Sequence, residues 1–117
     1  MRLQHPSGRA AEDLATEFLV AQGCQIIERN WHCRRGEIDL IVWDGSVCVF
    51  VEVKMRTSQA YGGAMASITT AKQRKLILSA QWYLHTRAQP EPACRFDAVL
   101  IDGNGHIQWL KNILECS

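Results

Sequence analysis

The sequence predicts an α/β protein with one mixed β-sheet flanked by helices, and two observations carry that prediction. Two segments repeat apolar residues at helical spacing, whereas five others are short, rich in β-branched residues and bounded by turn formers. The segments follow the order helix, three strands, helix, two strands, which is typical of helices packed on a single sheet. A chain of 117 residues supports one core, so we expect a single domain over residues 1–117.

Composition excludes several classes of protein. The chain is 47% hydrophobic and 21% charged, as in ordinary folded proteins. Its net charge of +1 gives no global attraction to nucleic acid, so such binding would need a local basic surface. The five cysteines show no metal-ligand spacing, which predicts reduced thiols in a cytoplasmic protein. No apolar run approaches the roughly 20 residues that span a bilayer, so we expect no membrane association.

The first helix is expected over residues 8–22. Leu14, Phe18 and Leu19 recur on one face, and Gly23 follows as a stop signal. Glu12 falls at the edge of this apolar face, one i to i+7 step from Leu19. Glu12 should therefore border whatever the helix packs against.

A first strand over residues 24–31 and a hairpin over residues 36–54 follow. Gly45-Ser46 predicts a two-residue type II′ turn, which places Asp44 opposite Val47. One face of the hairpin is then aliphatic, with Ile38, Leu40 and Val42 facing Val53, Val51 and Val49. The other face places Asp39 opposite Glu52 and Glu37 opposite Lys54. A turn at Asp44-Gly45 instead would make Asp39 a diagonal neighbour of Glu52.

Two carboxylates at adjacent positions repel each other unless a cation lies between them. Mg²⁺ typically takes one or two protein carboxylates and keeps several waters, so Asp39 and Glu52 are candidate ligands of Mg²⁺ or Mn²⁺. Lys54 projects from the same face and could act on an attacking water and stabilise charge on a phosphate. A solvated face, with Glu37 paired to Lys54, is the alternative interpretation.

The second half of the chain supplies a helix and two strands. Thr69 or Thr70 can cap a helix that ends before Pro90, and Lys72 and Gln73 lie at its N-terminal end on the inward side. Strands are expected over residues 95–101 and 106–110, separated by a tight turn, with Asp97 as an ion-pair partner of Arg95. The tryptophans, Trp31, Trp43, Trp82 and Trp109, are expected in the core or at an interface.

Several motifs occur in a characteristic order: Glu12 in the first helix, then GEIDLI, FVEVK, YGG, AKQRKL and RFDAVLI. This set resembles the YraN-like proteins, uncharacterised protein family 0102, and through them the PD-(D/E)xK nuclease superfamily, which includes archaeal Holliday junction resolvases. Ile38 stands where the superfamily motif has proline. The resemblance covers nearly the whole chain and implies a restriction-endonuclease-like fold.

The resemblance also implies roles. Asp39 and Glu52 would hold the metal, Lys54 would be catalytic, Glu12 would complete the site, and Lys72 or Gln73 would be auxiliary. Junction resolvases work as dimers, which implies a homodimer here. We therefore expect a metal-dependent endonuclease that acts on structured or branched DNA, with Lys72, Gln73, Arg56 and Arg74 at the phosphates. A non-catalytic nucleic-acid-binding module and a protein-interaction scaffold remain open alternatives.

Overall fold

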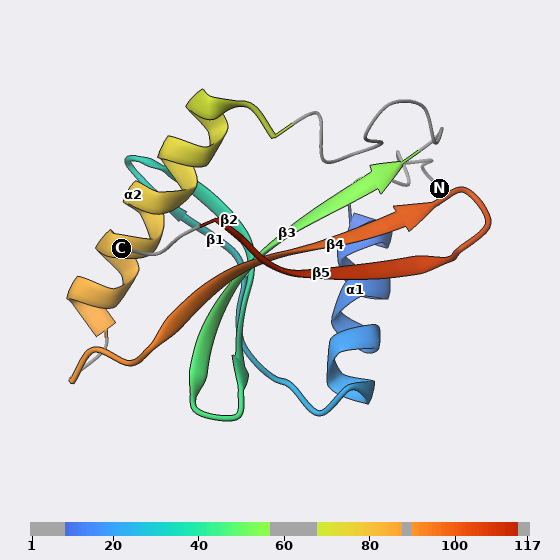
Figure 1. Cartoon of the computed structure of the whole chain (residues 1–117), viewed down its shortest axis with the longest axis horizontal. Helices are drawn as coiled ribbons and strands as arrows, with labels where there is room; N and C mark the ends of the chain where they lie inside the picture. The colour runs from blue at the N-terminus through green and yellow to red at the C-terminus, as the bar shows by residue number, and fades with distance from the viewer. Residues whose placement is uncertain (1–8, 57–67, 88–89, 115–117) are drawn as a thin grey trace.

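The computed structural model describes residues 9–56, 68–87 and 90–114. These residues form two helices and five strands in the predicted order (Figure 1). The elements are α1 (Arg9–Ala21), β1 (Gln25–Cys33), β2 (Gly36–Asp44), β3 (Val47–Arg56), α2 (Thr70–Arg87), β4 (Cys94–Asp102) and β5 (Ile107–Leu114). The predicted α/β fold class is confirmed, and the last strand is longer than the expected 106–110. No described helix is long and apolar enough to cross a bilayer.

The five strands form one mixed sheet in the order β1-β2-β3-β4-β5. All neighbouring strands are antiparallel except β3 and β4, which are parallel and are connected through α2. A parallel pair needs a crossover of a dozen or more residues, and α2 with its flanking segments supplies it. The carboxyl ends of β3 and β4 therefore lie at the same edge of the sheet.

Each helix covers a different face of the sheet. On one face, α1 packs Ala15 and Leu19 against Leu40, Val51 and other fully buried aliphatic side chains. On the opposite face, the α2 side chains Leu76, Ala80, Tyr83 and Leu84 pack against a cluster that contains Ile41, Phe50 and Phe96. Because alternate residues of β2 and β3 supply the two clusters, these central strands are apolar on both faces.

The hairpin turn has the predicted geometry. Asp44 pairs with Val47, Val42 with Val49 and Leu40 with Val51, so the loop is Gly45-Ser46. Gly45 has φ +64°, whereas Ser46 has no positive φ, as a type II′ turn requires. The alternative turn at Asp44-Gly45 is therefore wrong.

The predicted aliphatic face is wrong at one position, Ile38. Ile38 packs with Ile41 and Phe50 on the α2 side, whereas Leu40 packs on the α1 side. The neighbouring strand shows the cause: β1 shifts register between Ile26 and Glu28, and Asn30 has φ +53°. A bulge and a left-handed residue increase the local twist. The outer end of the β1–β2 hairpin is consequently turned toward α2.

Gly36, at the start of β2, contacts α2 closely. Its φ is +152°, and a Cβ atom added there would lie 3.2 Å from Ser79 Oγ and 3.7 Å from Lys75 Cβ. Residues with a side chain rarely adopt this φ, so glycine lets the tip of the β1–β2 hairpin rest on α2. This contact brings the residues before Gly36 next to the middle of α2.

Asp97 is a fully buried carboxylate in β4. It accepts hydrogen bonds from Arg95 Nε and Nη2, from Trp109 Nε1 and from the backbone N–H of Asn112, all at 2.9 Å. Arg95 also donates to Asp44 Oδ2 at 2.9 Å. The predicted Arg95–Asp97 ion pair is confirmed, and it joins the hairpin turn to β5 through β4.

Candidate functional site

The pairing of β2 with β3 ends at Leu40 and Val51, before the predicted site residues. The predicted backbone pairs Asp39–Glu52 and Glu37–Lys54 are therefore wrong. Beyond this point β2 continues to pair with β1, and β3 continues to pair with β4. The carboxylate of Asp39 replaces the missing ladder bond, because its Oδ2 accepts the backbone N–H of Val53 at 2.8 Å. Asp39 thus still reaches β3 directly beside Glu52.

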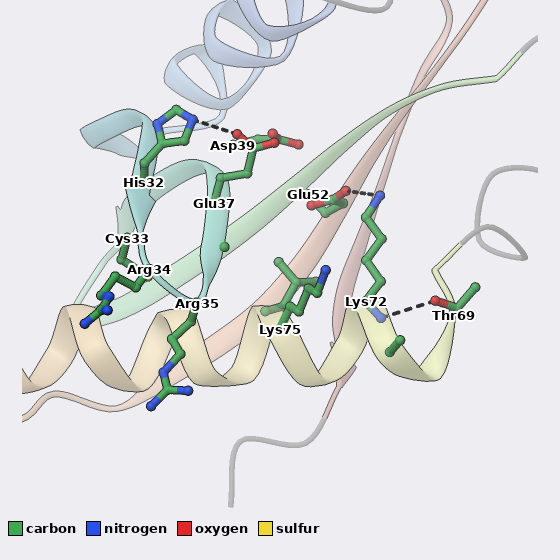
Figure 2. A pocket seen from close by; sticks show the side chains of 13 residues that line it. His32, Cys33, Arg34, Arg35, Glu37, Asp39, Glu52, Thr69, Lys72 and Lys75 are labelled. Atoms are coloured by element: carbon green, nitrogen blue, oxygen red, sulfur yellow. Dashed lines mark hydrogen bonds and ion pairs between the residues drawn. The ribbon is translucent and has the colours of Figure 1, made fainter.

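A cavity of about 680 Å³ opens where β2 and β3 separate. Asp39 and Glu52 both line it, together with residues from the β1–β2 turn and from the first turns of α2 (Figure 2). The full lining is His32, Cys33, Arg34, Arg35, Gly36, Glu37, Asp39, Glu52, Thr69, Ala71, Lys72, Lys75 and Leu76. The structure therefore brings three of the predicted site residues together in one pocket, namely Asp39, Glu52 and Lys72.

Glu52 is buried and is held by two lysines. Its relative exposure is 7%, and its Oε2 lies 3.2 Å from Lys72 Nζ and 3.8 Å from Lys54 Nζ. Figure 2 shows the Lys72 side chain extending from α2 to Glu52. A buried carboxylate needs a positive partner because its own desolvation is costly. Lys72 and Lys54 supply that charge from a helix and from β3 respectively.

The environment of Asp39 favours the protonated acid. Burial, and after it the negative charge of Glu52, raise the pKa of Asp39 to about 7 against the lowering effect of the Val53 hydrogen bond. Glu12 and Glu37 act in the same direction as Glu52. Several carboxylates therefore concentrate negative potential at Asp39, which is the condition under which a cation gains most from binding.

The two lysines differ in their proton affinity. Burial lowers the pKa of Lys54, and a hydrogen bond from Lys72 together with its charge lowers it further. Burial opposes the charge on Lys72 as well, but the hydrogen bond to Lys54 and the charge of Glu52 leave the pKa of Lys72 raised. Of the two amines, Lys54 is the one that gives up its proton more readily.

The N-terminus of α2 forms one wall of the cavity. Thr69 Oγ1 accepts the backbone N–H of Lys72 at 3.2 Å, which confirms Thr69 as the helix cap. Gln73, in contrast, donates from Nε2 to the carbonyl of Ile68 at 3.1 Å and does not line the cavity. Arg74 is exposed on the same helix. The side chain of Arg56 and the whole of Tyr61, Gly62 and Gly63 lie outside the described residues.

Three basic residues of the cavity were not among the predicted site residues: Arg34, Arg35 and Lys75. Arg34 and Arg35 form the β1–β2 turn, which Gly36 places against α2 beside Lys75. The sequence does contain a signal, since two arginines directly precede a glycine and an acidic residue. What it lacks is the tertiary contact with α2 that brings these arginines to the site.

Glu12 lies outside this cavity. It lines a second depression with Arg9, Asp13, Arg29 and Asn30, and its Oε1 is 3.8 Å from Arg29 Nη2. Burial raises the pKa of Glu12, against the lowering effect of Arg29. Its charge still influences Asp39. Glu12 thus lies outside the cavity that holds Asp39 and influences the pKa of Asp39 through its negative charge.

Glu37 pairs with a histidine instead of with Lys54. Its Oε1 lies 2.8 Å from His32 Nε2, and both side chains are exposed at the rim of the cavity. The expected Glu37–Lys54 pair of the solvated-face interpretation is therefore wrong. The end of β2 that carries Glu37 pairs with β1, whereas the end of β3 that carries Lys54 pairs with β4. Lys54 remains directed to Glu52.

The donor atoms suit a hard cation carried by two carboxylates. Asp39 and Glu52 offer oxygen atoms only, and their mutual repulsion would be relieved by a divalent ion. In the described part of the chain, no three His, Cys, Asp or Glu side chains are grouped so as to hold a metal. A metal bound here would therefore depend on Asp39, Glu52 and several waters, a ligand set of the kind that Mg²⁺ takes.

The fold and the pocket define a class: a small α/β protein in which two strand carboxylates and a helix lysine line a basic-rimmed cavity, while a second lysine, Lys54, contacts one of the carboxylates. The chain belongs to the uncharacterised protein family UPF0102, whose profile matches residues 11–101. A UPF0102 protein of Neisseria gonorrhoeae is 51% identical over 113 residues, covering 97% of this chain and 98% of the relative. UPF0102 proteins of Nitrosomonas eutropha and a Janthinobacterium species are 52% and 50% identical, covering 92% and 93% of this chain and 92% and 87% of the relatives.

Proposed function

We propose that this protein is a metal-dependent endonuclease of the cytoplasm that hydrolyses phosphodiester bonds in structured or branched DNA. One observation carries the proposal: Asp39 and Glu52, from strands that have just separated, share a cavity with Lys72 while Lys54 contacts Glu52. The resemblance to the PD-(D/E)xK superfamily assigns the same positions to catalysis. The reduced thiols of Cys24, Cys33 and Cys48 fit a reducing compartment.

Phosphate recognition would use the basic rim. Lys75, Arg34 and Arg35 line the cavity, and the capped N-terminus of α2 adds the favourable end of a helix dipole. Arg74 is exposed on α2 and extends the basic surface, with Gln73 supporting the first turn of the helix through Ile68. Arg56 stays a predicted phosphate contact at the end of β3. These cations would contact the phosphate backbone of the DNA and not its bases. They would therefore set the affinity and the register of binding but not a preference for one base sequence.

The chemistry would use the two lysines differently. Lys54, whose pKa is lowered, accepts a proton from the water that attacks phosphorus. Lys72, whose pKa is raised, keeps its charge and stabilises the negative charge that develops on the phosphoryl oxygens as the P–O bond breaks. Mg²⁺ or Mn²⁺ held by Asp39 and Glu52 would supply Lewis-acid polarisation of the phosphate. Glu12 helps to keep the negative potential at Asp39 high.

The test is cleavage of a panel of linear, nicked, flapped and four-way DNA in the presence of Mn²⁺ or Mg²⁺. Wild type should cleave at least one branched substrate, while Lys54→Ala and Glu52→Gln should not. Glu52→Gln should nevertheless retain DNA binding, since it removes a negative charge. Lys111→Ala is the matched control, because Lys111 is an exposed lysine of β5 over the ring of Trp109, away from the cavity. Cleavage that persists in Lys54→Ala would contradict the proposal.

A second candidate is a non-catalytic nucleic-acid-binding module. It is favoured by the Lys72–Glu52 ion pair at 3.2 Å, in which an ammonium already neutralises one of the two metal-binding carboxylates. This function predicts salt-sensitive DNA binding with no metal-dependent cleavage of any substrate by wild type. The same panel therefore separates the two candidates, and an absence of DNA binding would instead favour a protein-interaction scaffold.

A further inference from the structure

Trp82 departs from the expectation for the tryptophans of this chain. Trp31 packs edge-on against Tyr83, Trp109 packs edge-on against Phe18, and Trp43 joins the cluster beneath α2. Trp82, by contrast, is 50% exposed on α2 and is the one aromatic among the exposed large hydrophobic residues of the described chain. Its ring lies 6.5 Å from His85 at an angle of 42°, so the two rings are not stacked face to face. An exposed indole of this kind is available to a ligand.

Trp82 lies on the same face of α2 as Lys75, one of the residues that line the cavity. Lys75 and Trp82 are seven residues apart, about two helical turns, so they lie on the same face of α2. Lys75 lines the cavity, and Ser79, which contacts Gly36, lies between them along the helix. Trp82 is therefore less than one turn beyond the point where the β1–β2 turn touches α2.

Positive charge extends from the cavity along α2 in the direction of Trp82. Figure 2 shows Lys72, Lys75, Arg35 and Arg34 following one another along α2 from its N-terminal end toward its C-terminal half. Three of these cations, Lys75, Arg34 and Arg35, have no carboxylate partner among the contacts of the described residues. Unpaired cations next to an exposed aromatic ring are the combination that proteins use to hold single-stranded nucleic acid.

We propose that the surface formed by Lys75, Arg34, Arg35 and Trp82, here called the α2 track, binds an unpaired strand that leaves the cavity, with one base stacked on Trp82. The inference rests on the proposed function, since it names the substrate feature that the cavity would receive. Seven helical residues span about 10 Å, which is the length of roughly three nucleotides at the ~3.4 Å spacing of stacked bases. The preferred substrate therefore carries a single-stranded arm of at least three nucleotides beside the scissile phosphate.

The charge of the α2 track favours a nucleic-acid strand over a protein as its ligand. Leu78 and Trp82 are the only exposed large hydrophobic residues of α2, and they share the exposed surface of this helix with Arg74 and Lys75. Stable protein interfaces are depleted of lysine at their centre and bury about 800 Å² on each partner. Two apolar side chains on a basic helix supply too little apolar area for such an interface.

The test measures binding of a fluorescent thymine-only oligonucleotide and of a blunt duplex, without divalent metal. Trp82→Ala should weaken single-strand binding about 5- to 150-fold, the range expected for one lost base stack, and should change duplex binding by less than about twofold. Trp82→Phe should retain most of the affinity because a phenyl ring also stacks. Leu78→Ala is the matched control on the same face and should bind like wild type.

Three outcomes would overturn the α2 track. Trp82→Ala could bind single strands like wild type, or Leu78→Ala could lose as much affinity as Trp82→Ala. Alternatively, sedimentation could show that Trp82→Ala converts a dimer into a monomer, which would make this face a contact between two copies of the chain. The binding assay involves no cleavage, so a negative result in it would overturn the α2 track without affecting the cleavage test with Lys54→Ala and Glu52→Gln. An absence of cleavage would likewise leave the binding result valid.

Discussion

Asp39 accepts the backbone N–H of Val53 at 2.8 Å at the position where β2 and β3 have stopped pairing. The side chain thereby satisfies a donor that the sheet would otherwise leave open. The same hydrogen bond places the Asp39 carboxylate next to Glu52, whose charge raises the pKa of Asp39. One contact thus terminates the ladder and creates the acidic pair of the cavity.

The pH dependence of stability should reveal this acidic pair. The pKa of Asp39 is about 7 in the folded protein, against an ordinary value of 3.8, so between these values the folded state holds a proton that the unfolded state has lost. The contribution of Asp39 to the free energy of unfolding has its full value below pH ~4 and is lost as the pH rises to ~7. Asp39→Asn should remove that dependence and be more stable than wild type above pH ~7, by at most about 4 kcal/mol. Urea unfolding in EDTA across this range measures the difference.

The control for this measurement is Asp13→Asn. Asp13 is an exposed carboxylate that pairs with Arg29, so its replacement should keep the wild-type pH profile. If Asp39→Asn follows the wild-type profile as well, the acidic pair does not form in solution.

The contact between Gly36 and Ser79 gives a second prediction. Gly36→Ala forces an unfavourable φ and places a methyl group 3.2 Å from Ser79 Oγ, so it should cost about 1–3 kcal/mol of unfolding free energy. Ser79→Ala should be close to neutral, since the buried hydroxyl has no hydrogen-bond partner among the described atoms. The double variant should recover at least about 0.5 kcal/mol, as measured by a double-mutant cycle. Strict additivity would show that the two residues do not touch.

Asp97 supplies a prediction about the core. Asp97→Ala leaves Trp109 Nε1 and the Asn112 amide without their acceptor and leaves Arg95 with Asp44 alone. The expected cost is about 3 kcal/mol, typical of removing one partner of a buried ion pair. Chemical denaturation measures it, with Asp13→Ala as a surface comparison that should cost less than about 1 kcal/mol. A loss of similar size in both variants would contradict the structural role of Asp97.

Local signals in the sequence predicted much of the fold. The hairpin register follows from Gly45-Ser46 and from alternating apolar residues, both of which are contained in a few neighbouring positions. Thr69 as the cap of α2 is equally local. The prediction failed at Ile38, because the bulge and Asn30 of a different strand decide which face Ile38 takes.

The sequence predicted the acidic residues of the site but not all the residues that line the cavity. Asp39 and Glu52 were identified by their alternation in the hairpin, although a side-chain hydrogen bond, and not the backbone ladder, brings them together. Arg34 and Arg35 were not assigned to the site because the contact of Gly36 with Ser79 joins residues 43 positions apart. Tertiary contacts of that range leave no periodic signal in a single sequence.

Salt dependence should identify the phosphate contacts. Lys75→Ala and Arg35→Ala each remove one cation of the cavity rim, so each should reduce the slope of log K against log salt by about 1 for duplex DNA. Fluorescence anisotropy at several salt concentrations gives the slope. Lys111→Ala, which removes an exposed lysine of β5, should leave the slope unchanged. Equal slopes in wild type and both rim variants would place the phosphates elsewhere.

The ion pair between Lys72 and Glu52 makes a prediction about metal binding. Lys72 Nζ lies 3.2 Å from the Glu52 oxygen that a divalent cation would use, so the ammonium and the cation compete for it. Lys72→Ala should therefore bind Mg²⁺ about fivefold more tightly in calorimetric titration, which corresponds to about 1 kcal/mol of lost competition. The same variant should bind DNA more weakly, because a cation has been removed from the cavity. Lys75→Ala is the control: it lines the same cavity without contacting Glu52, so its Mg²⁺ affinity should match that of wild type. Weaker Mg²⁺ binding in Lys72→Ala would mean that Lys72 holds Glu52 in place for the metal instead of competing with it.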